Sequence, residues 1–211
     1  MRVPFTTMGA NLNPESLAEF WLWFEANDDE LFEVDQNSCD IFHRLSEAMQ
    51  KVDTNLTFEF GPVLENGSRE FVISAGGNLS SFRSVEAMYS TAPCSGRWNF
   101  IRFRQRRDFI NDFRLGYGSC VVKASDVHYV LCKDKKPNHV GIILFIDGYS
   151  AIDRETWDQI GFLFLDETLG EYDVERHVGA IQFFDCNSKQ FRKARPIAEL
   201  PAHFDRRIGR H

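Results

Sequence analysis

A β-hairpin in the first half of the chain is the feature that most constrains how this sequence can fold. Phe58 and Phe60 belong to a run in which apolar and polar residues alternate, and a second such run contains Ile73 and Ala75. Asn66-Gly67 stands between the two runs, and this dipeptide is the preferred pair for a two-residue type I′ turn. Such a loop would place Phe60 opposite Ile73 and Phe58 opposite Ala75, with both pairs on one face. The sequence therefore predicts an antiparallel strand pair with one apolar face.

Apolar periodicity predicts the other helices and strands. Asn13 and Asp153 stand where helix N-caps are expected, and Gly170 stands where the last predicted helix should stop. Residues 196–211 are basic, and we expect them to be partly loose. The predicted helices span about residues 14–26, 38–52, 82–92 and 153–170, and the predicted strands span about residues 56–60, 70–75, 98–104, 119–123, 127–133, 139–147 and 178–185.

The predicted strand 139–147 differs from the others because both of its faces are apolar. Val140, Ile142 and Leu144 occupy one face, whereas Ile143 and Phe145 occupy the other. A strand with two apolar faces is typical of the centre of a sheet that is covered on both sides. The two strands before it are expected to pair with each other as a meander.

The order of the predicted elements indicates the fold class. Helices and strands do not alternate regularly, so the sequence predicts an α+β fold with one mixed, mainly antiparallel sheet of about six to seven strands and helices packed on it. A chain of 211 residues buries roughly 70% of the surface that its unfolded form exposes. One large core is therefore sufficient, and no repeat or linker-like stretch divides the sequence. We expect a single domain over residues 1–211.

Composition narrows the classes of function. The chain contains 20 Phe residues, which indicate either a Phe-rich core or an aromatic contact surface, and composition alone favours the core. The formal net charge of −7 opposes a role in binding nucleic acid, because such proteins usually carry an excess of basic residues.

The cysteines and the apolar segments indicate a compartment. The five cysteines are widely spaced and form no C-x-x-C pair, so neither a zinc ribbon nor a redox motif is expected. Met1–Ala10 does not read as a signal peptide, and the longest apolar segment, Val140–Ile146, is too short to span a bilayer. We expect a cytoplasmic protein that has reduced thiols, no membrane role, and no metal or cofactor.

The first candidate site is a glycine-rich turn between a strand and a helix. Ser74, Gly76, Gly77 and Asn78 could present backbone N–H groups to a phosphate or a carboxylate, and Arg83 in the first turn of the next helix could add positive charge. The sequence is neither G-x-G-x-x-G nor a Walker A motif. The alternative, which we favour, is a tight turn that needs glycine for a positive φ.

The second candidate site is a basic strand. Arg102 and Arg104 are expected to share a face with Trp98 and Phe100. Such a face could bind single-stranded nucleic acid by stacking and charge, or it could hold an acidic ligand between guanidinium groups. The alternative, which the acidic net charge favours, is an edge strand whose arginines pair with carboxylates of the protein.

The third candidate is a group of carboxylates with one histidine: Asp166, Glu167, Glu171, Glu175 and His177. These residue types can ligate a metal or perform acid–base catalysis. No H-E-x-x-H or E-x-x-H pairing is present among them. A solvated helix end followed by a loop is the favoured alternative, since charge runs are usually solvated.

Four segments together resemble a family of small uncharacterised bacterial proteins. The resemblance implies a bacterial cytosolic domain, and this family carries no activity that can be transferred to the chain. The segments are Phe20-Trp21-Leu22-Trp23-Phe24, Phe71-Val72-Ile73-Ser74-Ala75-Gly76, Ala92-Pro93 through Trp98 to Arg104, and Leu169-Gly170-Glu171.

These observations lead to two main hypotheses of function. The first is a non-catalytic cytoplasmic binding or interaction protein, of the immunity or inhibitor class, whose partner would be a basic protein. The alternative is a small-molecule or phosphate-ligand domain, which could be an enzyme, that uses the Gly76-Gly77 turn and the strand of Arg102 and Arg104. A nucleic-acid binder is the least favoured hypothesis. The sequence leaves the oligomeric state and any catalysed reaction open.

Overall fold

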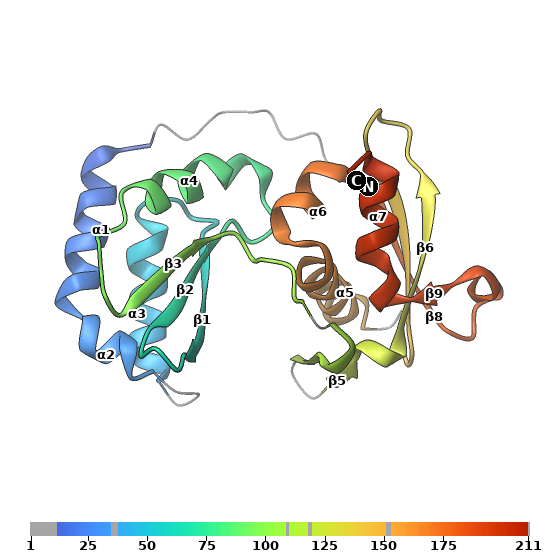
Figure 1. Ribbon diagram of the computed structural model, residues 1–211, viewed down its shortest axis with the longest axis horizontal. Helices are drawn as coiled ribbons and strands as arrows, with labels where there is room; N and C mark the ends of the chain where they lie inside the picture. Colours follow the sequence, from blue (N-terminus) through green and yellow to red (C-terminus); the bar gives the residue numbers. More distant parts are fainter. Residues whose placement is uncertain (1–11, 35–37, 109, 118–119, 151–152, 211) are drawn as a thin grey trace. The chain divides into compact units, whose positions relative to one another are not determined.

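The computed structural model describes residues 12–34, 38–108, 110–117, 120–150 and 153–210. The chain forms two compact units, Met1–Phe103 and Arg104–His211. Each unit has its own cluster of buried apolar side chains, and the described strands form three small sheets (Figure 1). The mixed α+β composition is confirmed, whereas the predictions of one sheet with six to seven strands and of one core are wrong. Local periodicity predicts strands, but it does not decide which distant strands pair. That residues 1–211 form a single domain stays a prediction.

The first unit combines helices with a three-stranded sheet whose strand order is β1-β2-β3. β1 and β2 are antiparallel, whereas β2 and β3 are parallel and are connected through α4. The elements are α1 (Pro14–Ala26), α2 (Asp28–Phe32), α3 (Cys39–Gln50), β1 (Thr57–Val63), β2 (Arg69–Ser74), the 3-10 turn η1 (Leu79–Ser81), α4 (Phe82–Ser90) and β3 (Trp98–Arg102).

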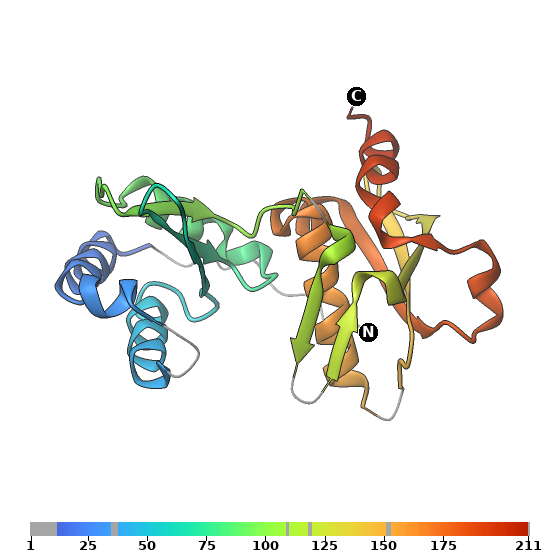
Figure 2. The same cartoon turned by 60° about the horizontal axis from the view of Figure 1, so that its bottom comes forward.

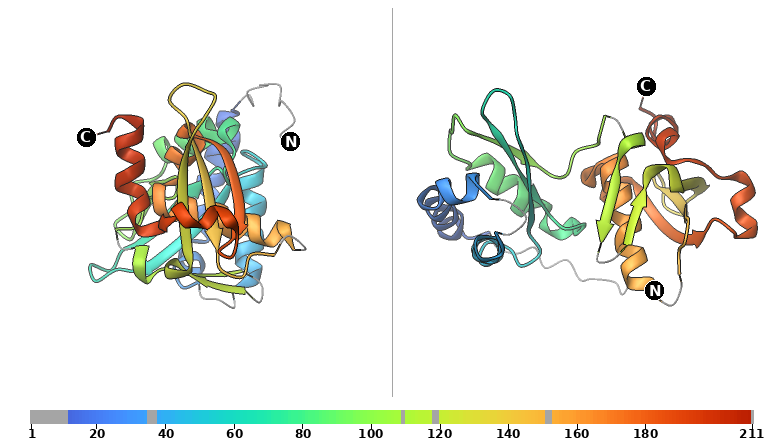
Figure 3. Two further views of the ribbon diagram at one scale, coloured as in Figure 1. Left: turned by 90° about the vertical axis from the view of Figure 1, so that its right-hand side faces the viewer. Right: turned by 90° about the horizontal axis from the view of Figure 1, so that it is seen from below.

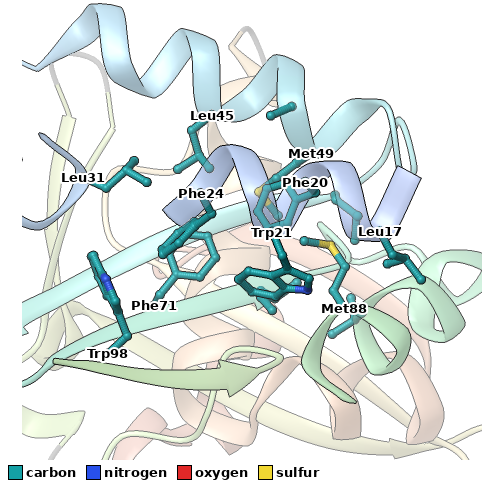
Figure 4. Close-up of a cluster of buried hydrophobic side chains, with 14 of the residues drawn as sticks. Leu17, Phe20, Trp21, Phe24, Leu31, Leu45, Met49, Phe71, Met88 and Trp98 are labelled. Carbon is teal, nitrogen blue, oxygen red and sulfur yellow. The ribbon is translucent and has the colours of Figure 1, made fainter. Parts of the chain in front are cut away.

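Aromatic side chains fill the core of the first unit (Figure 4). The ring of Phe24, on α1, lies 5.0 Å from that of Phe71 on β2 and 5.2 Å from that of Trp98 on β3, measured between centroids. Burial of one such ring stabilises a fold by about 1.5–3 kcal/mol. The Phe-rich composition is therefore a property of the core, as the sequence favoured.

The hairpin of β1 and β2 forms, but in a register different from the predicted one. Phe58 pairs with Ile73, and Phe60 pairs with Phe71. The N–H of Gly67 donates to the carbonyl of Leu64, and Gly67 has a φ of +78°. This is a three-residue loop with glycine in the left-handed position, an alternative that Asn-Gly sequences also support.

A second irregularity, between Phe60 and Val63, shifts the register further. It includes Pro62, which has no N–H for the ladder. Together the two shifts amount to two residues, so the same side chains still face the core. The predicted apolar face is thus correct although the predicted partners are wrong.

Both ends of the first predicted helix are confirmed, whereas a short helix that follows it was not predicted. The side chain of Asn13 accepts a hydrogen bond from the N–H of Glu15 at 3.0 Å, which confirms the N-cap of α1. The predicted span of about residues 14–26 matches α1, whereas α2 was not predicted. Asp28 and Asp29 lie in the first turn of α2, where negative charge suits the helix dipole.

The second unit contains a hairpin and a four-stranded sheet with the order β8-β7-β6-β9. β4 and β5 pair with each other, and β4 packs against α5 (Figures 2 and 3). The elements are the 3-10 turn η2 (Ile110–Asp112), β4 (Arg114–Tyr117), β5 (Cys120–Lys123), η3 (Ala124–Asp126), β6 (Val127–Lys133), β7 (Val140–Ile146), α5 (Arg154–Leu169), α6 (Glu171–His177), β8 (Val178–Asp185), η4 (Lys189–Lys193), β9 (Arg195–Pro196), η5 (Ile197–Glu199) and α7 (Leu200–Ile208).

β7 is central, as its two apolar faces predicted. It pairs with β6 in the antiparallel direction and with β8 in the parallel direction. Ile142 and Leu144 are buried in the same cluster as residues of α5, α6 and α7. On the opposite face the ring of Phe145 lies 5.6 Å from that of Phe191 on η4. The two faces of β7 are therefore covered by different segments.

Two expectations for the second unit are wrong. β5 pairs with β4 rather than with β6, so the predicted meander does not form. The basic tail is not loose, because it contains α7, where Leu200 and Phe204 are fully buried. These two side chains are four residues apart and share one helical face. The apolar pair, rather than the basic charge, therefore decides that this segment folds as a helix.

Candidate functional site

The glycine-rich turn uses its N–H groups within the protein. The N–H of Gly76 donates to Oγ of the fully buried Ser74 at 3.0 Å, and the N–H of Asn78 donates to the carbonyl of Ala75 at 3.1 Å. Gly76 and Gly77 have φ values of +58° and +73°, which favour glycine. These contacts favour the structural interpretation, and a ligand at the turn stays a prediction.

The residues that flank this turn also have structural contacts. The side chain of Asn78 accepts a hydrogen bond from the N–H of Ser80 at 3.1 Å and so caps η1. A Cβ added at Gly76 would lie 3.2 Å from the backbone oxygen of Asn55, so the turn packs closely on the preceding loop. Arg83 is exposed in the first turn of α4.

The basic strand β3 pairs its side chains with carboxylates of the first unit. Trp98 is buried, and its Nε1–H donates to Asp28. The guanidinium of Arg102 lies 2.6 Å from Oε2 of Glu86 and 5.3 Å from the ring centroid of Tyr89. The turn of Ser74 to Asn78 and Arg102 belong to the first unit, whereas Arg104 begins the second.

The carboxylates at the junction of α5 and α6 are buried rather than solvated, so the favoured interpretation of this group is wrong for three of its members. Asp166 is 7% exposed, Glu167 is 9% exposed, and Glu171 is fully buried. The N–H of Arg104 donates to Oε2 of Glu171 at 3.1 Å, and the N–H of Glu171 donates to the carbonyl of Arg104 at 3.0 Å. The backbone of residue 104 thus holds one of the carboxylates in place.

Asp166 is a buried acid of this group that lies beside Arg104. Its Oδ2 lies 3.8 Å from Nη1 of Arg104. Burial raises the pKa of Asp166 to about 8, and the negative charge of Glu171 contributes to the same shift, whereas Arg104 opposes it. A neutral carboxylic acid at pH 7 follows from this environment.

Further arginines form a network around the buried Asp173 that sequence reasoning missed. Arg106 donates to the carbonyl of Leu169 at 2.7 Å, to both oxygens of Asp205 at 2.8 Å and to Asp173 at 2.9 Å. Arg210 contacts both oxygens of Asp173 at 2.5 and 2.6 Å. The network ties the start of the second unit to α6 and α7, and its contacts favour a structural role. Within the described ranges, no three His, Cys, Asp or Glu side chains are arranged to hold a metal ion.

The negative charge of the chain is concentrated in the segment that contains the first three helices. Residues 14–50 contain ten Asp and Glu residues but only one basic residue, Arg44, which gives this segment a formal charge of −9. The remaining residues carry a formal charge of +2. The charge counted over the whole chain conceals this separation, whereas a count by segment would have revealed it.

The outer face of α1 combines these carboxylates with an exposed apolar residue. Glu15, Glu19 and Glu25 are exposed, and none of them forms an ion pair with a residue that the structure describes. Leu22 lies on the same side of the helix and is 67% exposed. Leu22 is therefore a solvent-exposed apolar group among these carboxylates.

A groove of about 260 Å³ runs between α1 and α3, next to this face. Arg44 is one of its basic residues, and it contacts Glu30 at 2.5 Å and Asp40 at 3.0 Å, so its charge is compensated. We call the outer face of α1 together with this groove the acidic helical face. The groove is lined by Ser16, Glu19, Phe20, Trp23, Arg44, Glu47, Ala48 and Lys51.

No family model, curated protein or solved structure matches this chain. Among the residues that the structure describes, no helix is long and apolar enough to cross a membrane.

Proposed function

We propose that this protein is a non-catalytic binding protein whose acidic helical face recognises a basic surface of another protein. The observation that carries the proposal is the formal charge of −9 on residues 14–50, in a chain whose remaining residues sum to +2. A surface of one sign raises the rate at which an oppositely charged partner associates. This profile fits the immunity or inhibitor class, acting in the cytoplasm.

Apolar groups on the same face provide contacts that charge alone does not. Leu22 is exposed, and Trp23 is half-buried in the wall of the groove. Aromatic side chains near the centre of an interface contribute much of its binding energy, while charges at the rim set rate and specificity. Leu22 and Trp23 would then form the centre of the interface. Its rim would consist of Glu15, Glu19 and Glu25.

The alternative, a phosphate-ligand domain, has less support. The N–H groups of Gly76 and Asn78 already donate to Ser74 and Ala75, and Arg102 is paired with Glu86. A phosphate at this turn would have to replace these contacts.

Affinity capture with the purified full-length chain tests the proposal. The triple variant Glu15→Lys/Glu19→Lys/Glu25→Lys reverses the rim charges, and the control Glu65→Lys/Asp112→Lys/Glu155→Lys reverses three exposed charges elsewhere. We expect wild type and control to retain one basic protein in stoichiometric amount and the triple variant to lose it. Retention by the triple variant, or the absence of any stoichiometric protein partner, would contradict the proposal.

A further inference from the structure

A second groove, of about 410 Å³, lies on the second unit beside the segment that joins β8 and β9. In Figure 1 this segment is the orange-red loop near the labels of these two strands. It contains the 3-10 turn η4. The lining residues are Cys186, Ser188, Lys189, Phe191 and Arg192.

Positive charges at this groove are not compensated within the described part of the chain. Lys189, Arg192 and the adjacent Lys193 are exposed, and none of them forms an ion pair with a described residue. By contrast, Arg195 lies 2.5 Å from Glu199. Three unpaired cations within five residues attract an anion.

Ser188 provides a second, independent observation. Its Oγ is buried and has no hydrogen-bond partner among the residues that the structure describes. Ser188 occupies the N-cap position of η4, but its side chain makes no capping hydrogen bond. Buried hydroxyl groups are rarely left unpaired. Because Ser188 lines the groove, a rotation about χ1 can turn its hydroxyl toward a bound molecule without the loss of any hydrogen bond.

Phe191 forms an apolar wall of the groove. Its ring makes edge-on contacts with Phe145 at 5.6 Å and with His128 at 5.0 Å, measured between centroids. Because Phe145 belongs to the central strand β7 and is fully buried, the ring is fixed against the sheet. A fixed aromatic wall suits a flat apolar group.

Cys186 marks the acidic end of the groove. Burial raises the pKa of its thiol to about 11, and the charges of Asp147 and Asp185 contribute to the same shift. The thiol is therefore neutral at pH 7 and is not an activated nucleophile. The carboxylates at this end repel an anion, so the anion-binding end is that of Lys189 and Arg192.

We propose that this groove binds a small molecule that carries an oxyanion, either phosphate or carboxylate, on a flat apolar body. Arg192 donates to the oxyanion through its guanidinium fork, while Lys189 adds a point charge and Ser188 a hydroxyl donor. The apolar body packs against Phe191. The proposed ligand is independent of the partner of the acidic helical face, because every residue of the groove belongs to the second unit.

Titration of the 15N-labelled full-length chain with phenyl phosphate, benzoate and inorganic phosphate tests this inference. We expect saturable shifts of the Ser188, Lys189 and Arg192 amide signals with phenyl phosphate or benzoate, and at least about fivefold weaker binding of inorganic phosphate, which lacks the apolar body. The tighter of the first two probes distinguishes phosphate from carboxylate. Shifts that do not saturate, or equal affinity for inorganic phosphate, would overturn the inference.

Two variants of the groove and one control variant separate this site from general attraction of anions. Arg192→Gln should weaken the tighter probe by about tenfold, because a charge-assisted hydrogen bond is lost, and Ser188→Ala by a smaller factor. Arg114→Gln removes an exposed cation of β4 and should leave the affinity unchanged. If Arg192→Gln and Arg114→Gln weaken binding of the probe equally, the chain attracts anions only by its diffuse positive charge, and the proposed site is wrong. Native amide spectra of all three variants confirm that each is folded.

Discussion

Replacement of Asp166 by Asn should change how the stability of the second unit depends on pH. Asp166 is 7% exposed, lies 3.8 Å from Arg104 and faces the fully buried Glu171; Glu167 and Glu175 add further negative charge. Its pKa rises from 3.8 to about 8 on folding, chiefly because burial disfavours the charged form. The side chain therefore stays protonated in the folded chain over a range in which the unfolded chain has released the proton.

The direction and size of the effect follow from proton linkage. Between about pH 4 and pH 8 the folded state holds one more proton than the unfolded state at this position. The free energy of unfolding then falls, through this group, by about 1.4 kcal/mol per pH unit as the pH rises, or about 4 kcal/mol from pH 4 to pH 7. Asn has nearly the same shape as the neutral acid but does not titrate. The stability of Asp166→Asn minus that of wild type should increase with pH by the same amount.

Amide hydrogen exchange of α5 at pH 5, 6 and 7 measures this difference in the second unit itself, and the carboxyl 13C shift of Asp166 gives its titration directly. Glu155→Gln serves as the control, because it removes an exposed carboxylate of the same helix and should leave the pH profile unchanged. A stability difference for Asp166→Asn that does not vary with pH, or a titration midpoint near 4, would refute the reasoning.

Three further substitutions test the packing and the charge network. Arg106→Ala removes hydrogen bonds to Leu169, Asp173 and Asp205. We expect the free energy of unfolding, measured in urea, to fall by about 3 kcal/mol, because carboxylates of low exposure lose a partner. A fall below about 1 kcal/mol would mean that Arg210 alone is a sufficient partner for Asp173. Gly161→Ala would place a Cβ 2.1 Å from Cε1 of Phe183, so it should lower the free energy of unfolding by about 1–3 kcal/mol. Alanine normally stabilises a helix interior relative to glycine, so an increase in Tm would show that the Phe183 ring moves freely aside. Phe71→Ala removes a fully buried ring and should lower the free energy of unfolding by about 3–5 kcal/mol. We expect the loss of amide protection to be confined to the first unit. Equal loss in both units would mean that they unfold together.

The sequence identified some parts of the candidate sites but not their surroundings. The carboxylates of α5 and α6 are visible in the sequence, yet their burial depends on Arg104, whose backbone meets Glu171 across 67 residues. The acidic helical face could have been found by counting charge along the chain. The exposure of Leu22 also follows from helical spacing, because Leu17, Phe20, Trp21 and Phe24 form the buried face of α1.

The sequence by itself determined the features that arise from neighbouring residues. Asn13 caps α1, Gly170 ends α5 with a φ of +82°, and the period of two in β1 and β2 selects the face that is buried. These outcomes depend on local hydrogen bonds and backbone geometry, which a few residues specify.

Only the tertiary structure decided which distant segments meet. It divided the described strands among three sheets, paired β5 with β4, placed α7 within the basic tail and buried Asp166 beside Arg104. Strand pairing and charge burial depend on the sum of many weak contacts between segments far apart in sequence, and no single segment encodes that sum.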